Sequence, residues 1–146
     1  MWKKIIFFIL IFFCTNALSN ENYFLMLKNS KVIVRMGPGL DYPVKFIYKK
    51  KYLPIKVIDK KENFRKIIDH KKNSGWIHIS QLKKVNSVIV LSKRILFKKP
   101  TINSKPLANV KSGKLFLLEK CKKNWCKVSS QNFSGWISTD NVWGKN

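Results

Sequence analysis

A repeat of about 60 residues constrains the fold of this 146-residue chain more than any other feature. The tetrapeptide Ser-Gly-Trp-Ile at residues 74–77 recurs at residues 134–137. Upstream of each copy, residues 64–67 and 125–128 place a large aromatic residue ahead of a lysine and a β-branched residue. Self-similarity at a fixed period indicates that one folding unit occurs twice. We therefore expect two related domains.

Within each copy the residue pattern is typical of short β-strands. Runs of Val, Ile, Leu and Phe are separated by Gly, Pro, Asn and Asp at intervals of about 8 to 12 residues. A sheet of few strands escapes exposed edges by closing on itself. We therefore predict an all-β protein of two tandem small barrels, at residues 24–85 and 88–146, each with about five short antiparallel strands.

The opening and closing segments of the first copy resemble the bacterial SH3 (SH3b) domain family. Residues 32–38 read Val-Ile-Val-Arg-Met-Gly-Pro, similar to the family's Asn-Val-Arg-x-Gly-Pro, and residues 75–77 are similar to its Gly-Trp-Val. The second copy keeps the closing half but has Lys-Lys-Pro at residues 98–100 in place of the Gly-Pro turn. The resemblance implies SH3-like barrels that are commonly exported and that bind cell-wall peptides or protein partners without catalysis.

The loop at residues 37–42 is the main candidate for a binding element. Because this loop lines the ligand groove of SH3-like barrels, the resemblance implies a groove containing Asp41 and Tyr42, with Tyr48 and Trp76 as further aromatic surfaces. Other interpretations remain open: the glycines supply positive φ to an ordinary loop, Tyr48 lies in a solvated lysine-rich loop, and Trp76 belongs to the core. Since the second copy lacks the Gly-Pro loop, we expect binding mainly in the first barrel.

The chain is strongly basic, with 30 Lys and Arg against 7 Asp and Glu and a formal net charge of +23. Only Arg35, Arg65 and Arg94 are arginines, although arginine is the better reader of phosphates and base edges. We therefore expect no specific nucleic-acid partner, and A/T-rich codons alone would also produce this lysine content. Nonspecific contact with anionic envelope polymers or lipid headgroups is the remaining charge-driven alternative.

The N-terminus is typical of a secretory signal. Two lysines precede an apolar run at residues 5–14, and the small residues Ala17 and Ser19 follow in the relation that signal peptidase favours. A helix of ten residues is about 15 Å long, half the thickness of a bilayer's hydrocarbon core of about 30 Å. We therefore expect removal of a signal peptide at residues 1–19 and a periplasmic or extracellular mature protein.

Cys121 and Cys126 enclose a candidate hairpin turn at Lys123 and Asn124. A two-residue turn there places the two cysteines directly opposite each other, at a Cα separation that a disulfide accepts. An exported setting favours the oxidised pair. We predict a structural disulfide; redox or metal chemistry at the same pair is the alternative.

No pattern for catalysis or cofactor binding occurs in the sequence. His70 and His78 are the side chains able to act as bases near neutral pH, and neither lies in a nucleophile motif. We therefore predict a protein that is not an enzyme, with no cofactor and no metal site. Peptide recognition is the main functional hypothesis, and the alternatives are a structural scaffold or spacer of two packed barrels and lysine-driven adhesion.

Overall fold

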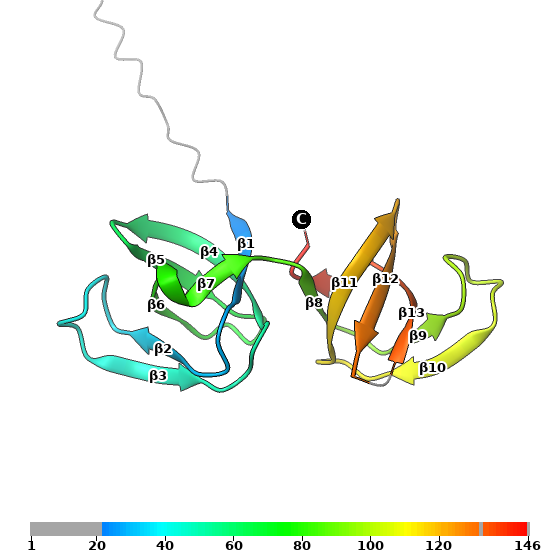
Figure 1. Ribbon diagram of the computed structural model, residues 1–146, viewed down its shortest axis with the longest axis horizontal. Coiled ribbons are helices and arrows are strands. Elements are labelled where there is room, and N and C mark those ends of the chain that lie inside the picture. Colours follow the sequence, from blue (N-terminus) through cyan, green and yellow to red (C-terminus); the bar gives the residue numbers. More distant parts are fainter. Residues whose placement is uncertain (1–21, 132, 146) are drawn as a thin grey trace, which may run out of the picture.

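The computed structural model describes residues 22–131 and 133–145, and its regular structure there is β-strand apart from one short 3-10 helix (Figure 1). The predicted signal peptide at residues 1–19 lies outside the described residues. Two lobes lie side by side, and each contains one antiparallel sheet of seven strands (Figure 1). The prediction of an all-β protein with two small, similar domains is confirmed.

The first sheet has the order β3-β2-β6-β5-β4-β1-β7 and the second has the order β10-β9-β13-β12-β11-β8-β14. The first repeat contains β1 (Tyr23–Leu27), β2 (Val32–Arg35), β3 (Val44–Tyr48), β4 (Pro54–Lys61), β5 (Phe64–Ile68), β6 (Ser74–His78), the 3-10 helix η1 (Ile79–Gln81) and β7 (Leu82–Lys84). The second repeat contains β8 (Ser87–Val90), β9 (Arg94–Phe97), β10 (Pro106–Val110), β11 (Leu115–Lys122), β12 (Trp125–Ser130), β13 (Phe133–Ser138) and β14 (Val142–Trp143).

Each sheet differs in two ways from the expected five-stranded barrel. Seven strands are present, because each repeat adds flanking strands as short as the three residues of β7 and the two residues of β14. Runs of that length show no alternation that sequence reading could detect. The end strands β3 and β7 are not paired with each other, so the backbone ladder stays open where a closed barrel was expected.

Side chains link β2 and β9 to residues at or after the ends of β6 and β13. In the first repeat the Gln81 amide receives a 3.0 Å hydrogen bond from the backbone N–H of Ile33 and donates a 3.3 Å bond to the Ile33 carbonyl. In the second repeat the Arg94 guanidinium donates to the carbonyls of Ser138 and Asp140. Both arrangements give hydrogen-bond partners to backbone groups near the ends of short strands. The two repeats use different residues, a glutamine and an arginine, to do so.

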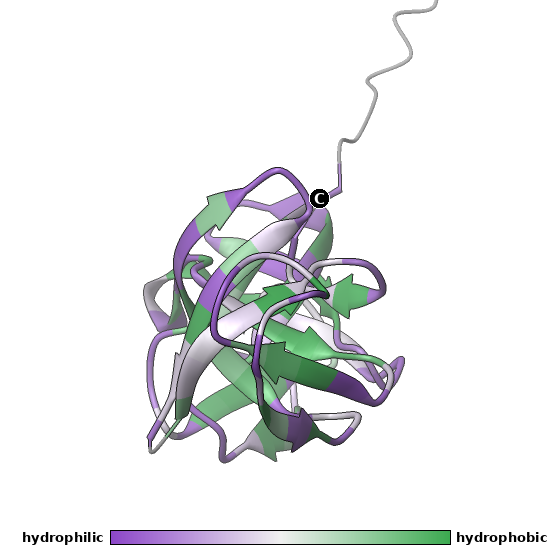
Figure 2. Ribbon diagram, turned by 90° about the vertical axis from the view of Figure 1, so that its right-hand side faces the viewer, coloured by the Kyte–Doolittle hydropathy of each residue, from purple (hydrophilic) through white to green (hydrophobic). Residues whose placement is uncertain are grey.

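Apolar side chains fill a separate core in each repeat. The first cluster includes Val32, Ile55, Ile67 and Ile77, and the second includes Leu96, Phe116, Val128 and Ile137. Apolar residues lie along the strands, whereas the turns are mostly hydrophilic (Figure 2). Alternation along β2, β6 and β12 buries one face and leaves the other for solvent or ligand, whereas β8 is buried at all four of its positions.

The signature glycines allow close approach of neighbouring strands. A Cβ atom on Gly75 would lie 2.3 Å from Cγ1 of Val34 in β2, and one on Gly135 would lie 2.8 Å from Cγ of Leu96 in β9. Real Cβ atoms do not tolerate such contacts, so glycine is required at both positions. The added Cβ atoms would also lie 3.1 Å from the carbonyl oxygen of Arg35 and 2.9 Å from that of Phe97, so the glycines let the strand backbones lie close together.

The predicted disulfide joins Cys121 to Cys126 across the β11–β12 hairpin. The register pairs Cys121 with Cys126 and Lys122 with Trp125, which leaves Lys123 and Asn124 as the turn. The Cα atoms are 4.0 Å apart. Cys126 is buried in the second core, so the bond ties the exposed end of the hairpin to that core.

The two repeats pack directly against each other. Ile89 of β8 is one of the buried residues of the first repeat's core cluster, and Leu115 and Trp143 pack against that cluster. The Ser87 hydroxyl also donates a 2.6 Å hydrogen bond to the Tyr52 carbonyl of the first repeat. The relative orientation of the repeats is therefore held by buried contacts.

Candidate functional site

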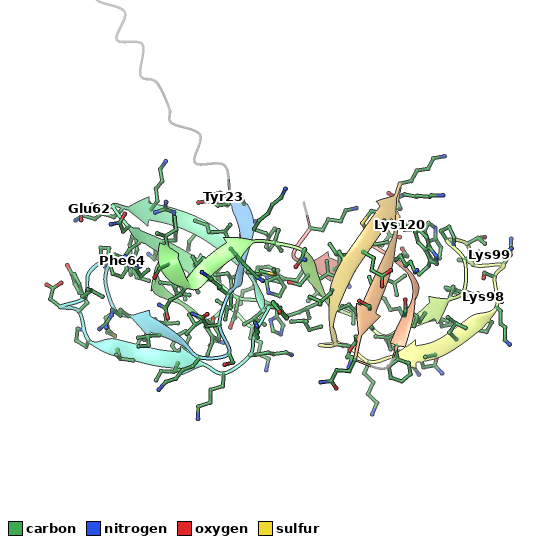
Figure 3. The ribbon with its side chains drawn as sticks, viewed as in Figure 1. Tyr23, Glu62, Phe64, Lys98, Lys99 and Lys120 are labelled. Carbon is green, nitrogen blue, oxygen red and sulfur yellow. A yellow bond between two sulfur atoms is a disulfide. The ribbon has the colours of Figure 1, made fainter. Side chains whose placement is uncertain are left out.

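A hollow of about 270 Å³ opens on the first repeat, and we call it the Arg35 groove. It is lined by Ile33, Arg35, Leu40, Phe64, His78, Ser80 and Gln81. Strand β2, the loop at residues 36–43, the facing ends of β5 and β6, and η1 supply these side chains. Phe64 lies at the end of the first repeat that is remote from the second (Figure 3). The groove therefore faces away from the contact between the repeats.

Strand register places the groove on one face of the sheet. Arg35 of β2 is directly opposite Trp76 of β6, and two positions further along β6 His78 is opposite Phe64 of β5. Opposite residues and residues two apart point to the same side. The Phe64 and His78 rings meet edge to face with centroids 5.1 Å apart, and this contact forms the apolar floor.

His78 presents a defined hydrogen-bond donor. Its Nδ1 accepts a 3.2 Å bond from the Ser80 backbone N–H and lies 2.7 Å from the Ser80 hydroxyl. Because Nδ1 acts as an acceptor, the neutral ring carries its proton on Nε2. The same bond caps the start of η1, so the groove wall and the ring orientation depend on one another.

Arg35 supplies the groove's positive charge. Its Nη1 donates a 2.8 Å hydrogen bond to the carbonyl of Tyr42, which uses one of the five guanidinium N–H groups and ties β2 to the loop. No Asp or Glu is among the residues that line the groove. A fixed guanidinium without a carboxylate partner is suited to bind a carboxylate of a ligand through paired hydrogen bonds.

The loop at residues 36–43 is folded around Tyr42. Its ring lies against Gly37, where a Cβ atom would be 2.2 Å from Cδ1 of the ring. Neither Gly37 nor Gly39 has a positive φ, so the expectation that these glycines supply left-handed geometry is wrong. Their role is to make room for the aromatic ring. The packed loop projects Leu40 beside the groove with 72% of its surface exposed.

The structure does not bring the four residues proposed from the sequence around one hollow. Asp41 and Tyr42 are exposed in the loop next to Leu40, and Trp76 lies half-buried on the groove face beside Arg35. Tyr48 is opposite Val32, whose side chain is in the core, so Tyr48 lies on the other face of the sheet. None of the four lines the Arg35 groove itself.

Tyr48 belongs to a polar network beneath the turn at residues 69–73. Its hydroxyl donates a 3.0 Å bond to the carboxylate of Asp69, which is only 2% exposed. That carboxylate also accepts bonds from the backbone N–H groups of Lys71 and Asn73. Burial and the adjacent carboxylate raise the pKa of Tyr48 far above its ordinary value. Tyr48 is therefore a neutral structural donor.

Sequence reasoning missed most of the groove residues. Arg35 and His78, for example, were not among the binding candidates proposed from the sequence. Position in the motifs could have indicated both, because Arg35 lies within the opening motif and His78 lies two positions after Trp76, on the same face. For Gln81, which acts across 48 residues, the sequence contains no comparable signal.

The second repeat fills the corresponding surface with aromatic rings. Phe97 is opposite Trp136, as Arg35 is opposite Trp76 in the first repeat. The Phe97 ring packs edge to face on Trp125 with centroids 5.7 Å apart, and Trp136 is only 7% exposed. The second repeat thus replaces the guanidinium with a packed hydrocarbon surface.

Three further properties of the described residues bear on function. Between residues 22 and 145, apart from residue 132, no group of three His, Cys, Asp or Glu side chains is placed to hold a metal ion. In the same part of the chain no helix is long and apolar enough to cross a membrane. His70 lies in the turn after β5, away from the groove, and burial lowers its pKa although Asp69 opposes this effect.

Two small β-sheet domains, one with an open groove beside a packed loop, define a binding module. The sequence profile of the bacterial SH3 domain matches residues 28–84 and again residues 93–144. Because these matches span well over half of the sequence, the chain belongs to the bacterial SH3 domain family. No curated protein of similar sequence was found.

The chain shows a partial likeness to the solved structures of NlpC2 and NlpC1 from Trichomonas vaginalis. Sequence identity is 10% and 9%, with TM-scores of 0.39 and 0.37. The likeness covers 86% of this chain and 49% and 47% of the other two. The chain thus spans about half the length of these proteins.

Proposed function

We propose that this protein is an exported, non-enzymatic binding module that holds an extended peptide in the Arg35 groove. The ligand is a cell-wall peptide or an extended protein segment that carries a carboxylate. The observation that carries the proposal is the Arg35 guanidinium, fixed by the Tyr42 carbonyl at the rim of a hollow without acidic lining residues. Membership of a family of binding domains supports it.

The groove offers complementary contacts for such a ligand. Arg35 pairs with the carboxylate, His78 Nε2–H donates to a peptide carbonyl, and Leu40 and Phe64 contact an apolar side chain. Tyr42 supports the loop from the side and Asp41 is positioned to attract a basic group nearby. Aromatic and apolar grooves of this kind favour extended segments that lose little entropy on binding.

Retention of the mature protein on purified peptidoglycan, at low and at high salt, tests the proposal. Retention that resists salt and is lost in Arg35→Leu, with unchanged thermal unfolding, is expected. Lys60→Gln removes the same charge from an exposed position outside the groove and serves as the matched control. Retention of Arg35→Leu equal to that of the wild type contradicts the groove assignment.

The packing between the repeats favours a second candidate, a rigid spacer. The core cluster shared by Ile89, Leu115 and Trp143 with the first repeat gives the protein a fixed shape. A spacer shows no retention on peptidoglycan at either salt concentration. Retention that salt abolishes identifies adhesion of the lysine surface to anionic envelope polymers or lipid headgroups instead.

The proposal includes export, with a mature protein that begins after residue 19 and contains repeats at residues 24–85 and 88–146. A basic start, an apolar run and small residues before the cleavage point support this. The intact mass of protein recovered outside the cytoplasm is expected to lack residues 1–19. A mass that includes them contradicts cleavage.

A further inference from the structure

A second surface with ligand-binding character lies between the repeats. One hollow of about 400 Å³ is lined by Lys50 and Tyr52 of the first repeat and by Lys114 and Ser129 of the second. A neighbouring hollow of about 470 Å³ continues past Ser129 toward Phe133. The two share four lining residues, so they form one continuous trough. This inter-repeat trough is separate from the Arg35 groove, with which it shares no residue.

The polar lining of the trough is unused within the protein. The hydroxyls of Ser129 and Ser130, the Gln131 amide and the ammonium groups of Lys50 and Lys114 have no hydrogen-bond or ion-pair partner among the described residues. Ser129 and Ser130 are partly buried in β12. Because these groups border the trough and make no bond within the protein, they are open to a ligand.

The trough ends at an exposed aromatic ring. Phe133 is opposite Ser130 in the β12–β13 pair and 53% of its surface is exposed. Hydroxyl and amide groups followed by an exposed ring form the combination that recognises a sugar, because sugars present hydroxyls at their edges and C–H groups on their faces.

The positive charge along the trough favours a sugar that carries acidic groups. No Asp or Glu lines either hollow, whereas Lys50 and Lys114 do. Lys51 and Lys83 add to this field, because their ammonium groups lie 4.9 and 4.6 Å from the centroid of the Tyr52 ring. Two lysines therefore lie over the Tyr52 ring, and two further lysines line the same hollow.

Tyr52 has a positive φ, a backbone conformation that favours glycine. Its φ is +65°, and the equivalent turn of the second repeat has Gly113 at +86°. The turns are equivalent because the Tyr52 N–H donates to the carbonyl of Leu27 in β1 and the Gly113 N–H to that of Val90 in β8. A bulky residue at positive φ is strained, and such strain gathers at functional positions. Glycine would serve this turn at lower cost.

We propose that the inter-repeat trough binds an acidic polysaccharide strand. Lysines at its mouth pair with the acidic groups, Ser129 and Ser130 bond sugar hydroxyls, and Phe133 contacts a sugar face. Tyr52 forms the wall between the two repeats and holds the neighbouring lysines in place. This inference is independent of peptide binding, since it uses none of the groove residues.

The test titrates the mature protein with a linear oligogalacturonate of six units and with chitohexaose, a neutral chain of the same length. Saturable binding of the acidic chain is expected, with chitohexaose at least tenfold weaker. The double variant Lys50→Gln with Lys114→Gln is expected to lose at least tenfold in affinity. Lys60→Gln with Lys105→Gln removes equal charge from exposed positions outside the trough and is expected to bind like the wild type.

Equal losses in the two double variants overturn the proposal, because they identify general attraction to a basic surface. Equal binding of chitohexaose overturns the assignment of an acidic ligand. Tyr52→Gly separates a binding role from a structural one: the proposal expects weaker binding with an unfolding temperature no lower than that of the wild type. Unchanged binding with a lower unfolding temperature overturns the role given to Tyr52. Arg35→Leu is expected to keep this binding in full, which distinguishes the trough from the groove.

Discussion

The indole Nε1 of Trp143, the last residue of β14, donates a 3.0 Å hydrogen bond to the carbonyl oxygen of Pro54 at the start of β4. This bond links residues 89 positions apart and joins the last strand of the second repeat to the first repeat. The same ring meets Phe24 of β1 edge to face at 5.2 Å. The two repeats therefore form one packed unit, with the C-terminus beside their contact (Figure 1).

Trp143→Ala is expected to uncouple the repeats. Loss of the ring from the shared core removes its packing on Phe24 and leaves the Pro54 carbonyl without its donor, which costs about 2 kcal/mol or more. Thermal unfolding should change from one cooperative transition to two. Leu107→Ala, at an exposed position of β10, is the control and should keep the single transition. A single transition in Trp143→Ala contradicts the coupling.

Tyr48→Phe is expected to lower the free energy of unfolding by about 1 to 2 kcal/mol without affecting ligand affinity. The variant keeps the ring but removes a hydrogen-bond donor from the buried Asp69 carboxylate. Chemical denaturation measures the first effect and peptidoglycan retention the second. Weakened retention with an unchanged free energy of unfolding would show that Tyr48 contacts the ligand and would contradict its structural role.

Reduction of the Cys121–Cys126 bond is expected to destabilise the second repeat by about 2 kcal/mol, because the bond closes a short loop of the unfolded chain. Denaturation with and without a reductant measures the difference, and Cys121→Ser with Cys126→Ala should match the reduced protein. Peptide mapping of exported protein under non-reducing conditions should recover the linked pair. Two free thiols there would refute the disulfide.

Tyr42→Ala is expected to weaken peptide binding about tenfold, since the loop that carries Leu40 loses the ring packed on Gly37. The thermal unfolding temperature should change little, because 42% of the ring is exposed. Tyr23→Ala is a matched control: its ring is 38% exposed and lies well apart from Phe64 (Figure 3). Loss of folding in Tyr42→Ala would show that the ring is a core element.

Features that depend on neighbouring residues could be predicted from the sequence. The disulfide follows from a two-residue turn, and the roles of Gly75 and Gly135 follow from their place in a repeated motif. The β-rich character of both repeats also follows from local runs and turn residues. Each of these needs only a short stretch of chain and the geometry of paired strands.

Features that depend on distant residues could not be predicted. The Gln81 amide meets Ile33 across 48 positions, and the Arg94 guanidinium reaches the carbonyl of Asp140 across 46. Tyr48 looked like a residue of a lysine-rich loop because its buried partner Asp69 lies 21 positions away. Contacts between distant residues determine which face of a strand is buried. The residues that line the groove lie on the opposite face, so they could not be identified from local sequence.

We propose that the first repeat alone carries the peptide groove. The most direct test is to titrate the mature protein with a soluble cell-wall stem peptide and to follow the chemical shifts of its backbone amides. The account predicts saturable shifts at Ile33, Arg35, Leu40, His78 and Gln81, with none at Ile95 and Phe97, the second repeat's counterparts of Ile33 and Arg35. Equal shifts in both repeats, or shifts confined to the second repeat, would contradict it.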